Sequence, residues 1–344
     1  MIVYLQYYFI TYFIIIYKII LRENLHYSTK PYAWVISDGT KGMENQSLAF
    51  AKLLNINYKL IKYDPPYFLK KIPLSNKLYI SSLKKYFLTN TTIPSYIITT
   101  GKRMAGVSVA LKFILKDKVI TIHIQNPKLP FEYFNLLLIP EHDNITAKNV
   151  IQTKGALSFF DSDDLNKLDE KKIKLIKKTK QNLILLMMGG KNKRYEPKNS
   201  DYYYLSMKII EATKNVGGQL IVLISRRTPL KAIKILQSSF LKHYEHFQII
   251  TSSEHNPYPD ILKITDYIVV TSDSVNMISE ASNLSIPLFV SHFPQETGKI
   301  SCFLNNLEKL GVLKKFKGKL FHYRKNKLNT NKETILKVNK FLGL

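Results

Sequence analysis

The 344-residue chain has one cysteine, Cys302, and only 25 acidic residues against 51 lysines and arginines. A single cysteine excludes disulfide bonds within the chain and fits a reducing compartment. No group of His and Cys residues has the spacing of a metal site, and no G-x-G-x-x-G turn marks a dinucleotide cofactor. The sequence therefore predicts a protein that works without a bound metal or cofactor.

The shortage of acidic residues leaves a formal net charge of +26. Such an excess favours polyanionic partners, which include nucleic acid, phosphorylated ligands and anionic membrane surfaces. The basic residues are spread along the chain, and neither an RNA-binding signature nor a zinc finger is present. We therefore expect no nucleic acid partner, and we expect a phosphorylated ligand and an anionic membrane surface.

Residues 1–22 are almost wholly apolar and aromatic, and about 20 such residues are just enough to span a bilayer. The stretch lacks the basic start and the small-residue cleavage site of a signal peptide. One interpretation is a membrane anchor, with Lys18, Arg22 and Lys30 holding the rest of the chain on the cytoplasmic face. The alternatives are an interfacial helix, or a wrongly assigned start that adds residues absent from the mature protein.

Apolar runs of strand length alternate with helical patterns along the rest of the sequence, which predicts an α/β fold with parallel sheets. The length suffices for two domains of ordinary size. We place a first Rossmann-like domain at residues 31–165 and a second at 180–325, followed by a C-terminal helix at 326–344.

The clearest strand–turn–helix–strand unit runs from Tyr267 to Phe293. In open α/β sheets, ligands bind beyond the carboxyl ends of the strands, where a helix N-terminus offers N–H groups to phosphate. Asp273 or Ser274 would be the N-cap of this helix, and Glu280 would lie about two turns further on. The simpler alternative is that the serines only cap the helix and that Glu280 is solvated.

Other strands of the second domain are predicted to end at the same edge. Arginines after such a strand suit bidentate contact with phosphate, and a loop with Tyr258 could stack on a nucleobase. The predicted phosphate- and donor-binding residues are Gly189, Gly190, Lys191, Ser225, Arg226, Arg227, Asn256, Tyr258, Ser272, Asp273, Ser274, Asn276 and Glu280.

The first domain repeats this arrangement at two turns that contain glycine and basic residues, after predicted strands at 33–37 and 96–100. Glycine lets backbone approach a ligand closely, and two such turns at one sheet edge predict an anion site. The predicted residues of this acceptor side are Gly39, Thr40, Gly42, Asn45, Gln46, Gly101 and Arg103.

Candidate acid–base groups follow other strands of the first domain. His142 is flanked by Glu141 and Asp143, which could tune its pKa, and Asp38 follows the first strand. Solvated loop side chains are the alternative. The D-x-D sequence at residues 161–163 resembles a metal–diphosphate motif, but it precedes a helical pattern and is interpreted as a helix cap.

Residues 67–92 are rich in lysine, tyrosine and phenylalanine. In a membrane-associated protein such a segment would face lipid. We favour the alternative, a poorly specified helical excursion from the sheet.

Seven of these motifs, in this order, resemble the mitochondrial fission "elongated mitochondria" family and its bacterial members over about residues 33 to 312. The matching stretches are Asp38-Gly39 with Gly42, Asn45 and Gln46, then 100–103, 140–143, 189–190, 225–229, 256–258 and 271–277.

The resemblance implies a GT-B-like fold, in which two Rossmann-like domains face each other across a cleft. It implies that Glu280 holds the ribose of a nucleotide-sugar and that residues 39–42 face the diphosphate of an acceptor. Asp38, Glu141 or His142 would then be the base in a metal-independent glycosyl transfer to a membrane-linked acceptor. The plant members imply an alternative function, a non-catalytic membrane-surface scaffold that recruits a dynamin-like GTPase as its protein partner.

Overall fold

The computed structural model describes residues 31–64, 77–88, 92–158, 181–191, 196–251, 258–293 and 298–344. Unit 1 comprises the described residues up to Ile139 together with Thr146–Ile151. Unit 2 comprises Pro140–Ile145 and the described residues from Gln152 to Leu344. Residues 1–22, Asn256 and the acidic run at 161–164 lie outside the described residues, so what the sequence predicts for them stays a prediction.

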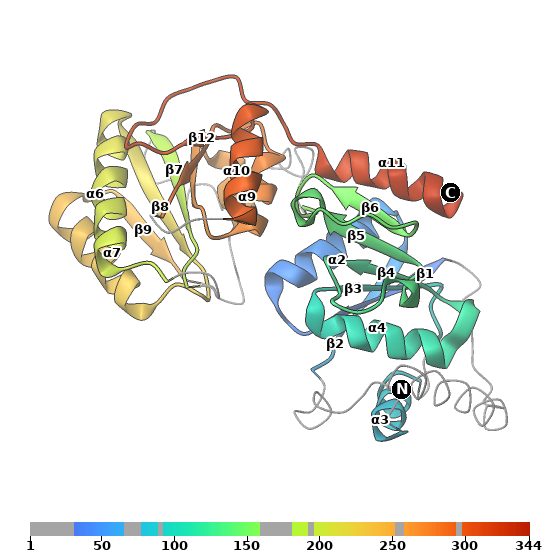
Figure 1. Cartoon of the computed structure of the whole chain (residues 1–344). Helices are drawn as coiled ribbons and strands as arrows, with labels where there is room; N and C mark the ends of the chain where they lie inside the picture. The colour runs from blue at the N-terminus through green and yellow to red at the C-terminus, as the bar shows by residue number, and fades with distance from the viewer. Residues whose placement is uncertain are drawn as a thin grey trace. The chain divides into compact units, whose positions relative to one another are not determined.

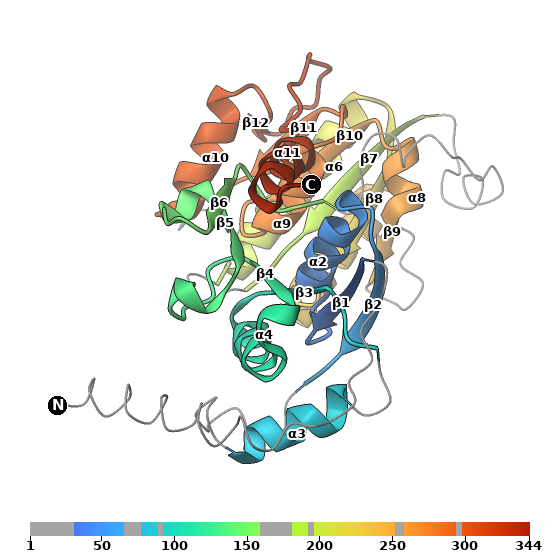
Figure 2. The ribbon, with the colours of Figure 1, turned by 90° about the vertical axis from the view of Figure 1, so that its right-hand side faces the viewer.

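Unit 1 is built on a six-stranded sheet in the order β2-β1-β3-β4-β5-β6, with parallel pairing from β2 through β5 (Figures 1 and 2). Most of its strands are buried apolar runs, as expected for a parallel sheet covered on both faces. The strands are β1 (Tyr32–Ser37), β2 (Asn57–Lys62), β3 (Tyr96–Thr100), β4 (Ile120–Ile124), β5 (Leu136–Pro140) and β6 (Val150–Thr153).

Three helices of unit 1 cover this sheet: α2 (Lys41–Leu53), α3 (Lys77–Phe87) and α4 (Lys102–Leu115). Alternate residues of β1 point to opposite faces, so Trp34 and Ile36 pack with the apolar faces of α3 and α4. In Figure 1, α2 lies on the other face of the sheet. Three short 3-10 helices complete the described connections: η2 (Lys116–Lys118), η3 (Phe131–Tyr133) and η4 (Glu141–Asp143), the last of which belongs to unit 2.

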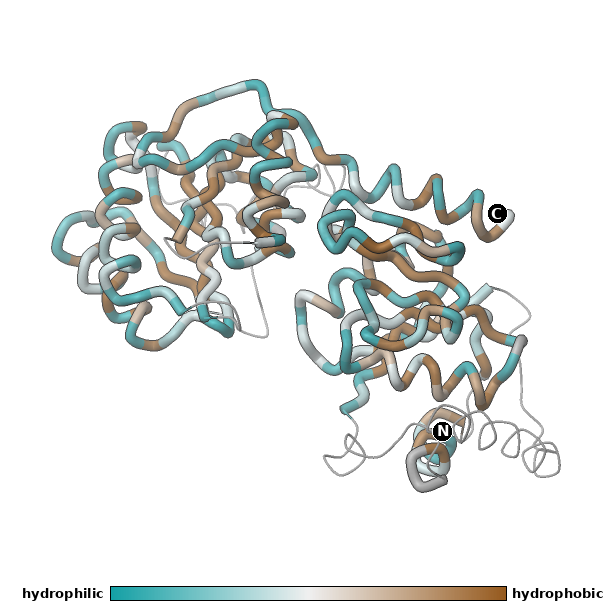
Figure 3. Tube along the Cα trace, viewed as in Figure 1, coloured by the Kyte–Doolittle hydropathy of each residue, from teal (hydrophilic) through white to brown (hydrophobic). Residues whose placement is uncertain are grey.

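Unit 2 contains a second six-stranded sheet, in the order β12-β11-β10-β7-β8-β9, and every pair in it is parallel. In Figure 3 its strands are largely hydrophobic. The strands are β7 (Asn182–Met188), β8 (Gly218–Ile224), β9 (Phe247–Ile250), β10 (Tyr267–Thr271), β11 (Leu288–Ser291) and β12 (Lys314–Lys315).

Two apolar clusters hold helices on the two faces of this sheet. One packs α8 (Tyr258–Ile264), α9 (Val275–Ser282) and α10 (Lys299–Lys309) against one face. The other packs α6 (Asn199–Asn215) and α7 (Leu230–His243) against the opposite face, as Figure 1 also shows. The last helix, α11 (Thr330–Leu342), ends the chain.

The two parallel sheets confirm the predicted α/β fold class, because each apolar run chosen as a strand lies in one of them. The strand-to-helix turns singled out in the sequence therefore lie at the carboxyl ends of parallel strands. In the part of the chain that the structure describes, no helix is both long and apolar enough to span a bilayer.

Candidate functional site

A buried carboxylate occupies the carboxyl edge of the unit 2 sheet. Asp273 accepts hydrogen bonds from the Gly190 backbone N–H at 2.9 Å and from the Thr271 hydroxyl at 2.7 Å. Its Oδ2 also lies 2.9 Å from Nη2 of Arg227. One side chain thus ties the ends of β7, β8 and β10 together.

The environment of Asp273 shifts its pKa in opposing directions. Burial raises the pKa of this carboxyl above its ordinary value, and this effect is only partly offset by the Arg227 guanidinium and by the hydrogen bonds from Gly190 and Thr271. These partners are what make a buried ionised carboxylate tolerable.

The two glycines after β7 are required by this carboxylate and by the neighbouring turn. A Cβ atom at Gly189 would lie 2.0 Å from Oδ2 of Asp273, and one at Gly190 would lie 2.1 Å from the carbonyl oxygen of Arg227. The sequence predicts that this turn approaches a phosphate. The structure gives it a carboxylate of the chain itself as its partner.

The turn after β8 presents two exposed arginines, Arg226 and Arg227. It is shaped by Ser225, whose hydroxyl accepts the Arg227 backbone N–H at 3.2 Å and lies 3.0 Å from the Thr228 hydroxyl. After β7, the Lys191 ammonium pairs with Glu196 at 2.6 Å. The edge therefore offers guanidinium groups to solvent from a turn with internal hydrogen bonds.

Helix α9 begins after Ser274, which is its N-cap residue as predicted, although the Ser274 side chain makes no capping hydrogen bond. The neighbouring Asp273 carboxylate is engaged by Gly190, Thr271 and Arg227. Ser272 is fully buried, and its hydroxyl accepts the Phe293 backbone N–H at 3.3 Å. Asn276 lies in the first turn of α9, half-buried.

Glu280, further along α9, is half-buried and accepts a hydrogen bond of 3.1 Å from the Tyr258 hydroxyl. The alternative that Glu280 is merely solvated is therefore wrong. Tyr258 is 8% exposed, and burial together with the nearby Glu280 charge raises the pKa of its phenol well above the ordinary value. The phenol stays protonated and so remains a donor to this carboxylate.

At the edge of unit 1, Asp38 connects the two predicted glycine turns. Its carboxylate accepts the Thr40 backbone N–H at 2.9 Å and lies 3.3 Å from Nη1 of Arg103. Gly39 and Gly101 have φ values of 80° and 81°, which favour glycine. Partial burial acts to raise the pKa of Asp38, but the Thr40 hydrogen bonds and the Arg103 guanidinium outweigh it, and the pKa is lowered. A lowered pKa makes Asp38 a weaker base.

Sequence reasoning missed Glu44, a buried carboxylate in the first turn of α2. It is 3% exposed, and its Oε1 lies 3.0 Å from Nζ of Lys41, whereas its Oε2 has no hydrogen-bond partner among the described residues. The i, i+3 spacing of Lys41 and Glu44 was the available signal. Of the other predicted acceptor-side residues, Gln46 is buried and donates to the Gly42 carbonyl at 3.2 Å, and Asn45 is half-buried.

The remaining acid–base candidates lie on η4, which belongs to unit 2. Glu141 is exposed, and the His142 ring lies 5.3 Å from the Phe303 ring. Asp143 pairs with the Lys299 ammonium at 2.7 Å. Its charge is therefore largely engaged by a lysine that sequence spacing did not connect to it.

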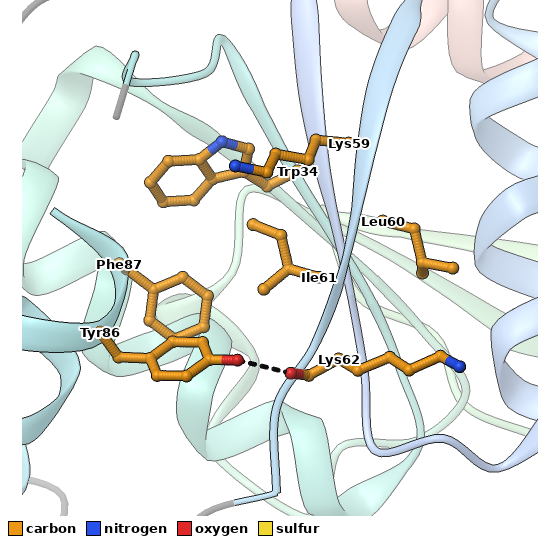
Figure 4. Close-up of a pocket in the computed structure, with 7 residues that line it drawn as sticks. All are labelled: Trp34, Lys59, Leu60, Ile61, Lys62, Tyr86 and Phe87. Atoms are coloured by element: carbon orange, nitrogen blue, oxygen red, sulfur yellow. Dashed lines mark hydrogen bonds between the residues drawn. The ribbon is translucent and has the colours of Figure 1, made fainter. Parts of the chain in front are cut away.

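A separate pocket of about 290 Å³ lies beside the edge strand β2 of unit 1. Figure 4 shows Lys59 reaching across the indole of Trp34, while the Lys62 side chain extends away on the other side of the strand. The Tyr86 hydroxyl donates to the Lys62 carbonyl at 2.7 Å. The residues lining the pocket are Trp34, Lys59, Leu60, Ile61, Lys62, Tyr86 and Phe87.

Residues 41–340 match the model of the mitochondrial fission ELM1 family. The chain belongs to this family. One relative, protein RP120 of Rickettsia prowazekii, is 26% identical to this chain. The match covers 76% of this chain and 83% of RP120. Mitochondrial fission protein ELM1 of Arabidopsis thaliana is 25% identical over 65% of this chain, which spans 58% of that plant protein.

Solved structures with a similar fold include two UDP-GlcNAc 2-epimerases. That of Methanocaldococcus jannaschii has a TM-score of 0.58 at 12% identity and covers 91% of this chain and 99% of its own. That of Neisseria meningitidis, bound to UDP-GlcNAc, has a TM-score of 0.52 at 14% identity, with 91% and 92% covered. At such identities the likeness shows the fold alone, and it is the GT-B fold expected from the sequence. In the described residues of this family member, no group of three or more His, Cys, Asp or Glu side chains could hold a metal ion.

Proposed function

We propose that this ELM1-family protein binds a nucleotide-sugar at the carboxyl edge of the unit 2 sheet. The observation that carries the proposal is the contact of 2.9 Å between Arg227 and Asp273, the residue two places before α9. It brings a guanidinium group to the start of a helix whose N-cap residue, Ser274, makes no capping hydrogen bond through its side chain. A guanidinium and a helix N-terminus together form a strong site for a diphosphate.

The rest of the nucleotide would extend from this diphosphate toward Glu280. A half-buried carboxylate oriented by the Tyr258 hydroxyl suits the hydroxyl groups of a ribose. The fold likeness to an epimerase bound to UDP-GlcNAc supports a uridine nucleotide as the first ligand to try. Arg226, exposed beside Arg227, would contact the phosphates from the solvent side.

The reaction we propose is metal-independent transfer of the sugar to a membrane-linked acceptor at the cytoplasmic membrane face. The turns at Gly39 and Gly101, which precede the N-termini of α2 and α4, would bind the acceptor's diphosphate. Asp38, Glu141 and His142 are the candidate bases. The lowered pKa of Asp38 favours the other two for this role.

Calorimetric titration with UDP and UDP-GlcNAc tests the binding step. Wild-type protein should bind one of them saturably, and Arg226→Ala and Glu280→Gln should each weaken binding about tenfold or more. Lys234→Ala, an exposed basic residue on α7, is the matched control and should bind as wild type. Absence of saturable binding to any nucleotide-sugar, tested across UDP, GDP and CMP donors, would exclude the proposal.

The family match supports a second candidate function, a non-catalytic scaffold on a membrane surface. A scaffold would keep the fold and use its surface to bind a protein partner such as a dynamin-like GTPase. The double variant Arg226→Ala/Glu280→Gln separates the two functions in cells. A scaffold would complement loss of the native protein despite these changes, whereas a nucleotide-sugar enzyme would not.

A further inference from the structure

We propose that one corner of unit 1 binds the surface of an anionic phospholipid bilayer. This β2–α3 corner consists of β2 (Asn57–Lys62), α3 (Lys77–Phe87) and the pocket beside them. The inference rests on the membrane part of the proposed function. It takes up the lipid-facing interpretation of residues 67–92, which include α3, and assigns the contact to a defined surface.

The two elements of the corner carry charge of one sign, although the exposed Asp64 follows β2 two residues after Lys62. The sequences NYKLIK and KLYISSLKKYF of β2 and α3 contain five lysines and no Asp or Glu. Lys59 and Lys62 are exposed, and neither lies within salt-bridge distance of a carboxylate in the described part of the chain. Each unpaired lysine brought close to an anionic leaflet strengthens binding about fivefold.

The aromatic side chains of the corner suit the boundary between headgroups and acyl chains. Tyr58 and Tyr86 are 41% and 53% exposed, although large aromatic rings are usually buried. Tyrosine is favoured at membrane interfaces because its ring is apolar and its hydroxyl is polar. The hydrogen bond from the Tyr86 hydroxyl to the Lys62 carbonyl holds that ring at the rim of the pocket.

The pocket of about 290 Å³ fits part of one lipid headgroup. The ammonium of Lys59 lies beside the indole of Trp34, so a lipid phosphate bound at Lys59 would lie at the mouth of this pocket (Figure 4). Lys62 extends on the opposite side of β2, where a single small phosphate bound at Lys59 cannot also reach it. Two lysines on opposite sides of an edge strand favour an extended anionic surface over one soluble phosphorylated molecule.

Sedimentation with lipid vesicles tests this proposal on the full chain. Phosphatidylcholine vesicles are compared with vesicles containing about 30% phosphatidylserine, at low and physiological salt. We expect wild-type protein to prefer the anionic vesicles, Lys59→Gln/Lys62→Gln to bind them about 25-fold more weakly, and Lys59→Glu/Lys62→Glu to bind more weakly still.

The matched control is Lys234→Glu/Lys242→Glu, which makes the same change of charge at two exposed lysines on α7 of unit 2. Its binding should stay within about twofold of wild type. Equal losses in both double variants would mean that only net charge matters, and would overturn the assignment. Unchanged vesicle binding of the Lys59/Lys62 variants would overturn it as well, since another segment would then carry the contact.

A third result also counts against the bilayer. Binding of the soluble ligand glycerol 3-phosphate is measured as well. If Lys59→Gln/Lys62→Gln changes the affinity for glycerol 3-phosphate, and wild-type protein shows no preference for anionic vesicles, the corner is assigned to a soluble phosphate. Thermal unfolding of every variant confirms folding. Titration with UDP-GlcNAc, measured in parallel, reports on the nucleotide site separately, so failure of one proposal is distinguishable from failure of the other.

Discussion

The carboxylate of Asp273 lies against the backbone of Gly189, so closely that a Cβ atom there would fall 2.0 Å from Oδ2. The same carboxylate accepts the Gly190 N–H and pairs with Arg227. A glycine turn at the end of β7 and the turn before α9 are thus fitted to each other. The fit between these two turns fixes the position of the Arg227 guanidinium.

This relationship predicts non-additive effects on stability. Asp273→Ala should lower the free energy of unfolding by about 2–3 kcal/mol, because it leaves the buried Gly190 N–H without an acceptor. Gly189→Ala should lower it by about 1–3 kcal/mol through overpacking. Combined with Asp273→Ala, the Gly189→Ala change should lose most of its effect, since the clashing carboxylate is gone. Urea unfolding of the four proteins measures the coupling.

Gly217→Ala is the control for this cycle. Gly217 has a φ of 59° and no atom within 4 Å of an added Cβ, so only backbone strain of about 1 kcal/mol is expected. Its effect should be the same with and without Asp273. Strict additivity of Gly189→Ala and Asp273→Ala would show that the two turns are not fitted in solution.

His123 should make the protein sensitive to acid. This fully buried side chain lies on β4, with Nδ1 2.8 Å from the Thr99 hydroxyl, and burial lowers its pKa to about 3. Between pH 6.5 and 3 the imidazole is protonated in the unfolded chain and neutral in the folded one. The free energy of unfolding therefore falls as the pH falls. The slope contributed by this group approaches 1.4 kcal/mol per pH unit.

His123→Asn keeps an acceptor near the Nδ1 position and removes the titration. Urea midpoints measured from pH 7.5 to 4 should fall less steeply for this variant than for wild type. His243→Asn, in the last turn of α7, is the control and should keep the wild-type slope. Parallel curves for wild type and His123→Asn would contradict the prediction.

Lys325 should have an effect of the same sign at alkaline pH. Its ammonium donates to the carbonyls of Ala281, Ser282 and Leu284 at the end of α9, and burial, aided by Lys327, lowers its pKa to about 7. Between pH 7 and 10.5 the unfolded lysine holds a proton that the folded one has lost. Stability therefore rises with pH across this range, and below pH 7 the lysine is protonated in both states and adds no further pH dependence.

Lys325→Met removes this titration, so its stability relative to wild type should decrease as the pH rises from 7 to 10. Thermal unfolding at several pH values measures the difference. The exposed Lys319→Met serves as the control and should follow the wild-type curve. A constant offset between wild type and Lys325→Met would show that the folded lysine titrates as an ordinary one.

The bond between Tyr258 and Glu280 predicts a specific effect on nucleotide binding. Tyr258→Phe should weaken UDP binding about three- to tenfold, because the carboxylate loses the donor that orients it. The affinity for 2′,3′-dideoxy-UDP should change little, since that ligand has no ribose hydroxyl groups for Glu280 to accept from. Equal weakening of both ligands would assign Tyr258 to packing alone.

Tyr323→Phe is the matched control for this substitution. It removes a phenol of unit 2 that bonds to the Leu288 backbone, with 2.7 Å to the carbonyl oxygen. It should lower stability but leave the ratio of UDP to dideoxy-UDP affinity as in wild type. Calorimetry provides both affinities.

The amino-acid sequence by itself determined the two parallel sheets and the edge at which functional residues gather. Apolar runs bounded by turn residues predicted strands such as β3 and β10 because burial on both faces requires such runs. All strands of a parallel sheet point the same way, so residues that follow a strand must meet at one edge. Arg226, Arg227 and Ser274 were therefore placed on an edge without knowledge of their contacts.

Only the tertiary structure decided which of these residues pair with one another. Asp273 accepts a hydrogen bond from Gly190, 83 residues away in sequence, and Lys299 donates one to Asp143, 156 residues away. Such pairings depend on strand order and on side-chain direction, which local propensity and spacing do not specify. For the same reason Glu44, a helical glutamate by sequence, proved to be buried, and the pocket beside Lys59 was visible only once β2 lay at the edge of its sheet.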